Sequence, residues 1–350
     1  MVEATAAVAP AVVAPAAEAS NALGAVAAMG VTSATLKARI SALKARMALP
    51  VFAAPMFLVS GPELVIAACK AGVVGTFPTL NARPIEELER WFQQITAELG
   101  AFKALGGNPA PWAANLIVHR SNPRAEADLA LTLRYQPEIV ITALSTPASV
   151  IEAVHGYGGL VFADVNSVAY ARKAAAAGAD GLVLIASGAG GHTGALTPFA
   201  FVAAVREFFD GPLIVGGGIA NGRAVRAVEV LGADFAYIGT RFIATAESRA
   251  AEGYKQMLVE STEEDLLLTA HFTGVPANYL RPSIEAAGLK PEALSVRAEK
   301  KFDHRGSDEA KAWRDIWAAG QGVRQVKHSP PVAELVAELR ADYLAARATP

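Results

Sequence analysis

A histidine surrounded by glycines is the part of this sequence that most directly suggests chemistry. The segment Gly188-Ala189-Gly190-Gly191-His192-Thr193-Gly194 follows an apolar run over residues 181–187. Such a run is typical of a buried strand, so His192 would lie at its carboxyl end, where glycines let the backbone approach a ligand closely. An imidazole accepts or donates a proton near neutral pH. We therefore predict that His192 is catalytic.

Two further glycine loops follow later strand-like runs. Gly216-Gly217-Gly218 comes after residues 212–215, and Gly239-Thr240-Arg241-Phe242 comes after residues 235–238. The first loop leads into the N-terminus of a helix, and backbone N–H groups at such a place bind anions. Arg241 would add a cation there or form a structural ion pair. The two loops predict a phosphate site for a bound cofactor or a phosphorylated metabolite.

The other histidines and the cysteine indicate no second reactive centre. The remaining histidines are interpreted as hydrogen-bonded structural side chains: His119, His155, His271, His304 and His328. No second histidine lies at metal-ligand spacing from His192, so we predict no metal site. The single cysteine, Cys69, lies in an apolar run and is interpreted as a buried thiol rather than a nucleophile.

Apolar runs alternating with helical patterns would position these loops. Eight runs follow residue 50, over residues 50–57, 73–77, 113–118, 139–144, 160–165, 181–187, 212–215 and 235–238. Eight strand–helix units predict an α/β fold, a (β/α)8 TIM barrel. A doubly wound sheet would carry Gly-x-Gly-x-x-Gly after its first strand, and that motif does not occur there. In a barrel the carboxyl ends of the strands share one rim, so His192 would neighbour the phosphate loops.

Four segments are predicted along the chain. An Ala-rich tail covers residues 1–34, the barrel covers 35–245, a mostly helical lid covers 246–325, and a C-terminal helix packing on the barrel covers 326–350. Residues 263–269 are predicted as one of the lid helices. The lid segment keeps several aromatic residues without strand periodicity, whereas a free tail should be polar.

Composition limits the possible partners. The 350 residues are 53% hydrophobic and 18% charged, with a formal net charge of −2 and no strongly basic stretch. Nucleic acid and membrane surfaces are therefore not expected as partners. The start of the chain lacks the basic region and the unbroken apolar core of a secretory signal, so we expect a cytoplasmic protein.

Taken in order, these motifs resemble the nitronate monooxygenase (2-nitropropane dioxygenase-like) family. Residues 179–194 match its Ala-Gly-Gly-His-x-Gly signature, and residues 217–222 and 231–242 match the family at the expected distances. Ala54-Pro55-Met56 on the first strand and Asn115 on the third also match. The resemblance covers residues 48–325.

The resemblance implies an FMN-dependent barrel enzyme with a helical lid, and a homodimer is a further expectation. His192 would be the catalytic residue. The flavin ring would contact Ala54, Pro55, Met56 and Asn115. The ribityl chain and phosphate would be held by Gly190, Gly191, Gly217, Gly218, Tyr237, Ile238, Gly239 and Thr240. The implied reaction is oxidation of alkyl nitronates or nitroalkanes by O₂ to a carbonyl compound and nitrite.

Two positions depart from the family pattern. Where the family often has Gln and Glu, this chain has Ile185 and Gly188, so a side-chain contact to the flavin is missing or is supplied by the backbone. One alternative function is an FMN-dependent NAD(P)H:quinone or enone/enoyl reductase. Another is a flavin-free phosphate-binding lyase or epimerase, although no strand-like run ends in the lysine that a Schiff-base aldolase requires.

Overall fold

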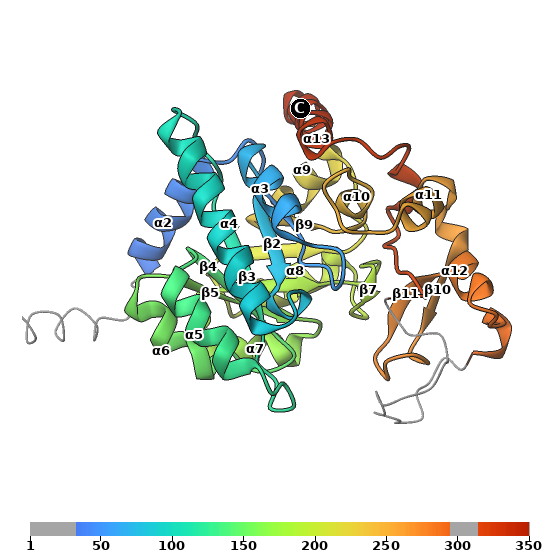
Figure 1. The fold of residues 1–350 in the computed structure, drawn as a ribbon, viewed down its shortest axis with the longest axis horizontal. Helices are drawn as coiled ribbons and strands as arrows, with labels where there is room; N and C mark the ends of the chain where they lie inside the picture. Colours follow the sequence, from blue (N-terminus) through green and yellow to red (C-terminus); the bar gives the residue numbers. More distant parts are fainter. Residues whose placement is uncertain (1–32, 295–313, 350) are drawn as a thin grey trace, which may run out of the picture.

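A closed barrel of eight parallel strands forms the centre of the molecule (Figure 1). The computed structural model describes residues 33–294 and 314–349. The strands are β1 (Val51–Ala53), β2 (Val74–Pro78), β3 (Trp112–Ile117), β4 (Ile139–Ala143), β5 (Leu160–Val165), β6 (Gly181–Ile185), β8 (Leu213–Gly216) and β9 (Phe235–Ile238). The order β1-β2-β3-β4-β5-β6-β8-β9 closes on itself through the pairing of β1 with β9. The predicted TIM barrel is confirmed.

Helices cover the outside of the barrel. They are α3 (Pro62–Lys70), α4 (Ile85–Ala104), α5 (Ala125–Tyr135), α6 (Ala148–Gly156), α7 (Val168–Ala176), α8 (Pro198–Arg206), α9 (Gly222–Val230) and α13 (Val332–Ala348). Side-chain caps start several of them: Ser167 accepts from Tyr170 N, and Thr197 accepts from Ala200 N. The last helix, α13, packs on α9 and α3, and its apolar side chains join the outer core of the barrel. It therefore completes the ring of helices.

Alternate strand residues fill the barrel interior. Phe52 and Phe235 meet there edge to face, with ring centroids 5.2 Å apart. Ile40 and Leu43 of α2 (Ser33–Ala45) join the same buried cluster. The helix α2 thus closes the amino end of the barrel and leaves the carboxyl end for the site.

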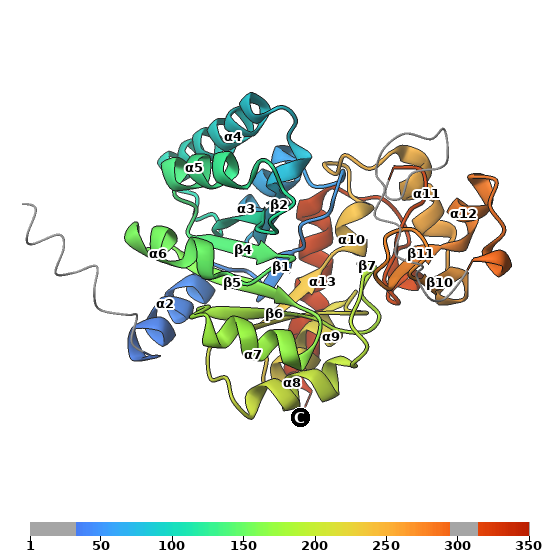
Figure 2. The same ribbon diagram turned by 90° about the horizontal axis from the view of Figure 1, so that it is seen from below.

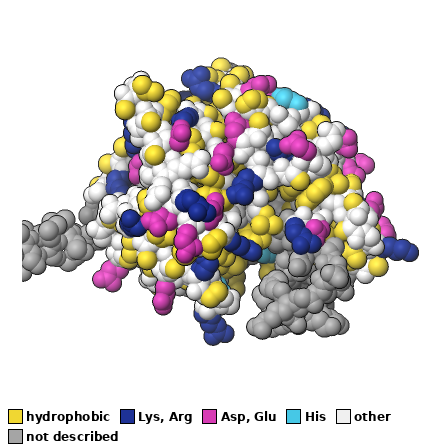
Figure 3. Space-filling model, viewed as in Figure 1, with side chains coloured by type: hydrophobic (Ala, Val, Ile, Leu, Met, Phe, Trp, Pro, Cys, Tyr) yellow, Lys and Arg dark blue, Asp and Glu magenta, His cyan; other side chains and the backbone are white. Residues whose placement is uncertain are grey.

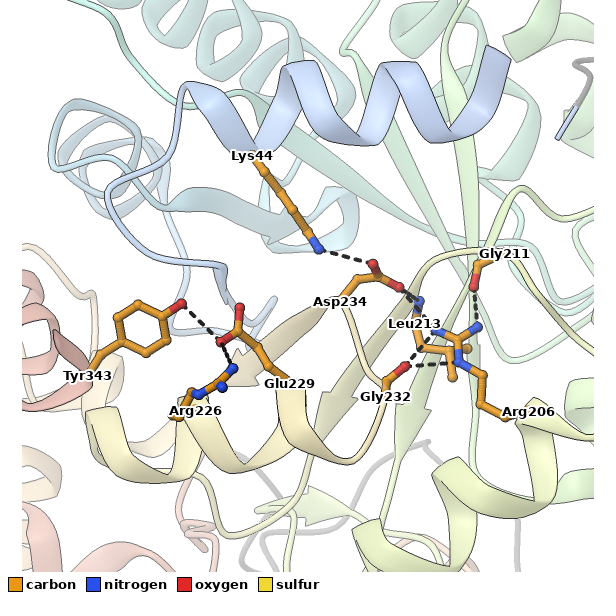
Figure 4. Close-up of polar contacts among 9 residues, drawn as sticks. All are labelled: Lys44, Arg206, Gly211, Leu213, Arg226, Glu229, Gly232, Asp234 and Tyr343. Carbon is orange, nitrogen blue, oxygen red and sulfur yellow. Dashed lines mark hydrogen bonds and ion pairs between the residues drawn. The ribbon is translucent and has the colours of Figure 1, made fainter. Parts of the chain in front are cut away.

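A polar network ties the outer elements together at the amino ends of the strands (Figure 4). Asp234 accepts hydrogen bonds from Lys44 of α2 (3.0 Å), Arg206 of α8 (3.1 Å) and the backbone N–H of Leu213 (3.0 Å). On α9, Glu229 accepts from Tyr343 of α13 at 2.9 Å. Asp234, which is part of a family motif, therefore has a structural role.

The lid lies beside the barrel and contains a small sheet as well as helices (Figures 1 and 2). Its helices are α11 (Glu252–Glu260) and α12 (Arg281–Ala286), and its antiparallel sheet has the order β10 (Leu266–Thr269), β11 (Ala277–Leu280), β7 (Gly191–His192). The helix predicted over residues 263–269 is wrong. A short 3-10 turn, Glu263–Asp265, begins with a capping box in which Asp265 accepts from Thr262 N at 2.7 Å. It does not continue as a helix because the following leucines pair with β11.

Three sequence expectations concern the rest of the molecule. Cys69 is buried, and burial raises the pKa of its thiol to about 12, which fits a structural residue. Acidic and basic side chains are interspersed over the face shown in Figure 3. Within the described ranges, the helices are all too short or too polar to cross a membrane. The predicted tail, apart from residues 33 and 34, lies outside the described residues, as does His304.

Candidate active site

His192 lies where the barrel and the lid are joined. It follows β6 on the two-residue strand β7, which pairs with β11 of the lid (Figure 2). Its register partner on β11 is Ala277. The next residue, Thr193, bonds to both sides: its N–H donates to Pro276 O at 3.1 Å and its hydroxyl donates to Ala186 O at 2.9 Å. The glycine-rich loop is therefore held between two rigid elements.

A lid hydroxyl orients the imidazole of His192. Nε2 lies 3.0 Å from Thr273 Oγ1, and the Thr273 hydroxyl is within donating distance of Val275 O at 3.2 Å. When that hydroxyl donates to Val275, its oxygen accepts from Nε2–H and Nδ1 carries the lone pair; this tautomer is inferred from the contacts. Burial lowers the pKa of His192 below its usual value. The ring is consequently neutral at pH 7 and able to accept a proton.

Glycines allow the loops after β6 and β8 to approach each other closely. Gly188 O accepts from Gly218 N at 3.1 Å, and both glycines have positive φ (+86° and +71°). A Cβ at Gly190 would lie 2.6 Å from Gly320 N, and a Cβ at Gly217 would lie 2.7 Å from Ser187 O. These contacts leave no room for a side chain, so backbone atoms line this part of the rim. We call the segments around Gly188, Gly190, Gly217 and Gly218 the glycine cradle.

Residues 319–322 also border this cradle, and no sequence pattern predicted their role. Gln321 N donates to Gly188 O at 2.9 Å, and Gly320 N donates to Thr240 Oγ1 at 2.9 Å. A Cβ at Gly322 would lie 2.5 Å from the Cβ of Ala220. The motif Gly320-Gln321-Gly322 could have indicated this role, but it lies within the predicted lid segment, where no function was expected for it. This segment links the β6, β8 and β9 loops.

Several of the groups near the two predicted phosphate loops already have partners within the protein. The N-terminus of α9 is already capped, because Arg223 N donates to the Asp342 carboxylate at 3.0 Å and Ala224 N donates to Asn221 Oδ1 at 2.9 Å. Arg241 takes its structural alternative, with Glu338 at 2.9 Å and Ala220 O at 3.0 Å. At the short helix α10 (Thr240–Ile243), the N–H groups of Phe242 and Ile243 donate to Gly239 O at 2.8 Å and 3.0 Å.

The ends of β1 and β9 bring several predicted residues together. Ala54 N donates to Ile238 O at 2.9 Å, and a Cβ at Gly239 would lie 3.5 Å from Met56 Sδ. Asn81 fixes the loop after β1 by donating to the carbonyl oxygens of Met56 (2.9 Å) and Ser60 (2.8 Å). The predicted first strand ends early at Ala53, since Pro55 has no N–H for the ladder.

The side chains of two predicted residues point to opposite sides of the barrel wall. Ile238 packs its side chain into the outer core, so only its backbone borders the rim. Asn115 lies inside the barrel and donates to Ile141 O of the next strand at 3.3 Å. Ile185, at the position of the family's Gln, packs against the barrel interior.

The floor of the mouth holds an acidic residue that the sequence analysis did not single out. Asp164 is on β5 and Tyr237 is on β9, and both Asp164 Oδ1 and the Tyr237 hydroxyl are buried without a hydrogen-bond partner among the described residues. Burial raises the pKa of Asp164 to about 7. The pKa of Tyr237 is raised well above its usual value by burial and by the Asp164 charge. The available signal was one acidic residue inside an apolar run.

Comparison with known proteins places this chain in a family. The family model described as nitronate monooxygenase matches residues 37–342. The chain belongs to the nitronate monooxygenase family, a family of flavin-dependent oxidoreductases, and it is accordingly an enzyme.

Relatives and solved structures agree with this assignment. A nitronate monooxygenase of Paraburkholderia phytofirmans is 28% identical over 333 residues, which cover 83% of this chain and 91% of that protein. A nitroalkane oxidase from Streptomyces ansochromogenes has a TM-score of 0.74 and 26% identity, covering 87% of this chain and 99% of its own. FabK from Thermotoga maritima shares the fold, with a TM-score of 0.68 and 22% identity. The match covers 88% of this chain and 96% of FabK.

Proposed function

We propose that this chain binds FMN in the barrel mouth and uses O₂ to oxidise alkyl nitronates to carbonyl compounds and nitrite, with His192 as the catalytic residue. Membership of the nitronate monooxygenase family supports nitronate oxidation as the class of reaction. The observation that carries the proposal is the position of His192. A neutral, hydrogen-bonded imidazole lies on the loop that itself forms part of the glycine cradle.

The described residues fit a flavin. Close approaches at Gly190 and Gly217 leave a backbone-lined cradle, and two buried polar atoms in the mouth lack partners. The phosphate would be held at Gly217-Gly218 and Gly239-Thr240, and the ring would lie toward the β1 residues Ala54 to Met56. Bound there, the flavin supplies the electron transfer that the reaction needs.

His192 would act on the nitro compound directly. As a neutral base it can remove the α-proton of a nitroalkane, and the protonated ring can then bind the resulting anionic nitro group. Thr273 would hold the ring in the orientation in which this proton transfer is possible. The lid strand β11, paired with β7, would limit access of water to the reacting charges.

Two measurements test the proposal. The absorption spectrum of the purified protein should show oxidised flavin, and nitrite should be released when a nitronate and O₂ are added. Loss of colour with NADH under nitrogen, without nitrite release from nitronate, would instead assign the chain to the reductases. A colourless protein that does not take up FMN would overturn the proposal.

A further inference from the structure

Asp164 occupies an unusual position for a charged residue. Leu160 and Phe162 of β5 belong to the barrel interior, and side chains two residues apart on a strand share a face, so Asp164 also points inward. It is the last inward-pointing residue of β5, because the strand ends one residue later at Val165, toward the carboxyl rim. Among the eight barrel strands, all of them described, Asp164 is the only charged residue.

Among the described residues, Asp164 has no ion pair and no hydrogen-bond partner for its buried oxygen, Oδ1. Of the barrel strands, only β5 and β9 carry titratable side chains, namely Asp164 and Tyr237. His192 lies on the following loop around the rim. Tyr237 brings no positive charge and has a buried hydroxyl of its own without a partner in the described ranges. The floor therefore holds two polar groups that these residues leave unsatisfied.

A half-buried carboxyl with one buried, unpartnered oxygen is favoured as the neutral acid. Without a cation or hydrogen-bond donors, the carboxylate loses the hydration of its buried oxygen and gains nothing in return. The pKa of about 7 reflects this burial alone. A neutral carboxyl and a phenol each present an O–H donor. Two buried donors without acceptors are costly, so an occupant of the mouth that offers carbonyl or ring-nitrogen acceptors would satisfy both.

We propose that Asp164 binds the flavin ring as a neutral carboxylic acid, beside Tyr237, so that FMN binding takes up one proton when Asp164 is ionised in the free protein. The inference rests on the proposed binding of FMN and assigns a role to a side chain that the glycine cradle does not include. The isoalloxazine ring has the acceptor atoms required, whereas the phosphate is held elsewhere in the site.

The proposal predicts how FMN affinity depends on pH. Below pH 7 Asp164 already carries its proton in the free protein, so its protonation does not make the FMN affinity depend on pH. Above pH 7 each bound FMN must recruit a proton, so the Kd should rise toward tenfold for each pH unit. The FMN phosphate has a second pKa of about 6, so measurements between pH 7.5 and 9 avoid its titration.

The test is titration of flavin-free protein with FMN, followed by flavin fluorescence, for three proteins across this pH range. Wild type should show the rising Kd. Asp164→Asn, which keeps an N–H donor but does not titrate, should show a Kd that varies at most threefold. Tyr237→Phe, which removes the other donor, should weaken binding at every pH and keep the wild-type slope. Circular dichroism confirms that each variant is folded.

Calorimetry at pH 8 in two buffers of different ionisation enthalpy counts the protons directly, with close to one expected for wild type and none for Asp164→Asn. Equal pH slopes and equal proton counts in these two proteins would overturn the role of Asp164 and leave the proposed function intact. Failure of the wild type to bind FMN would overturn the proposed function, and this inference with it.

Discussion

His192 is paired with Ala277 across the ladder between β7 and β11. The histidine of the barrel rim is therefore a residue of the lid sheet, although it is 85 positions away from its partner in sequence. Its ring is held from the same side, by Thr273 of the lid. Any displacement of the lid would move the imidazole relative to the glycine cradle.

Replacement of the imidazole should remove proton transfer. We expect His192→Asn to lower the rate of nitrite release from a neutral nitroalkane by about 10²- to 10⁴-fold, while the protein still binds FMN. His328→Asn is a matched control, because His328 is exposed and contacts only surface glutamates of α13. Initial rates of nitrite formation measure the effect. An unchanged rate in His192→Asn would refute the catalytic assignment.

Thr273 should influence the reaction through the orientation of His192. We expect Thr273→Val, which keeps the shape and loses the hydroxyl, to lower kcat by roughly tenfold with little change in KM. Thr273→Ser should restore most of the activity because it restores the hydrogen bond. A Thr273→Ser protein as slow as Thr273→Val would show that the methyl group, and not the hydroxyl, matters.

Asp164 should make the flavin-free protein less stable as the pH rises. Its folded pKa of about 7 lies above its unfolded value, so folding binds a proton between about pH 4 and pH 7 and stability is lost across that window. Asp164→Asn removes this term. The Tm of the variant should therefore equal that of wild type near pH 4 and exceed it at pH 7.5.

His192 has the opposite effect on stability, because its folded pKa is lowered and stability is lost as the pH falls through its unfolded value near 6.5. The term is common to both proteins and cancels in the difference between their Tm values. A difference between wild type and Asp164→Asn that does not change with pH would contradict the burial of this carboxyl.

The cradle should not accept a single methyl group. In Gly190→Ala the new Cβ would lie 2.6 Å from Gly320 N and 2.7 Å from the Ala319 carbonyl carbon, so backbone must move. We expect a loss of about 1–3 kcal/mol in stability and weaker FMN binding. Gly100→Ala in α4 is the control, because nothing lies within 4 Å of the added atom. It should be neutral or slightly stabilising.

The barrel could be predicted because each strand is a local pattern. Runs such as Leu160–Val165 are short, continuous and bounded by glycine or a helix cap. The lid sheet could not, because a two-residue strand such as Gly191–His192 exists only through its partner. Leu266–Thr269 is too short an apolar run to separate helix from strand without knowledge of its pairing.

The site was predictable to the same degree. The glycine loops and His192 stand out in the sequence because four glycines surround a single histidine and two further glycine loops follow later strands. Asp164 does not stand out until the inward phase of β5 is known. The segment containing Gly320 becomes part of the site through contacts with Gly190 and Thr240, which lie far away in the sequence.

The return of α13 to the barrel has a consequence for how the chain must be assembled. The eighth helix comes after the lid and not after the last strand, so Val332, Leu335 and Leu339 reach the outer core only once the whole lid has been synthesised. During translation the flank of α9 and α3 stays uncovered until the final helix arrives. If translation stopped within the lid, the barrel would keep an exposed apolar surface along α9 and α3. Chaperones and proteases would recognise this form most readily.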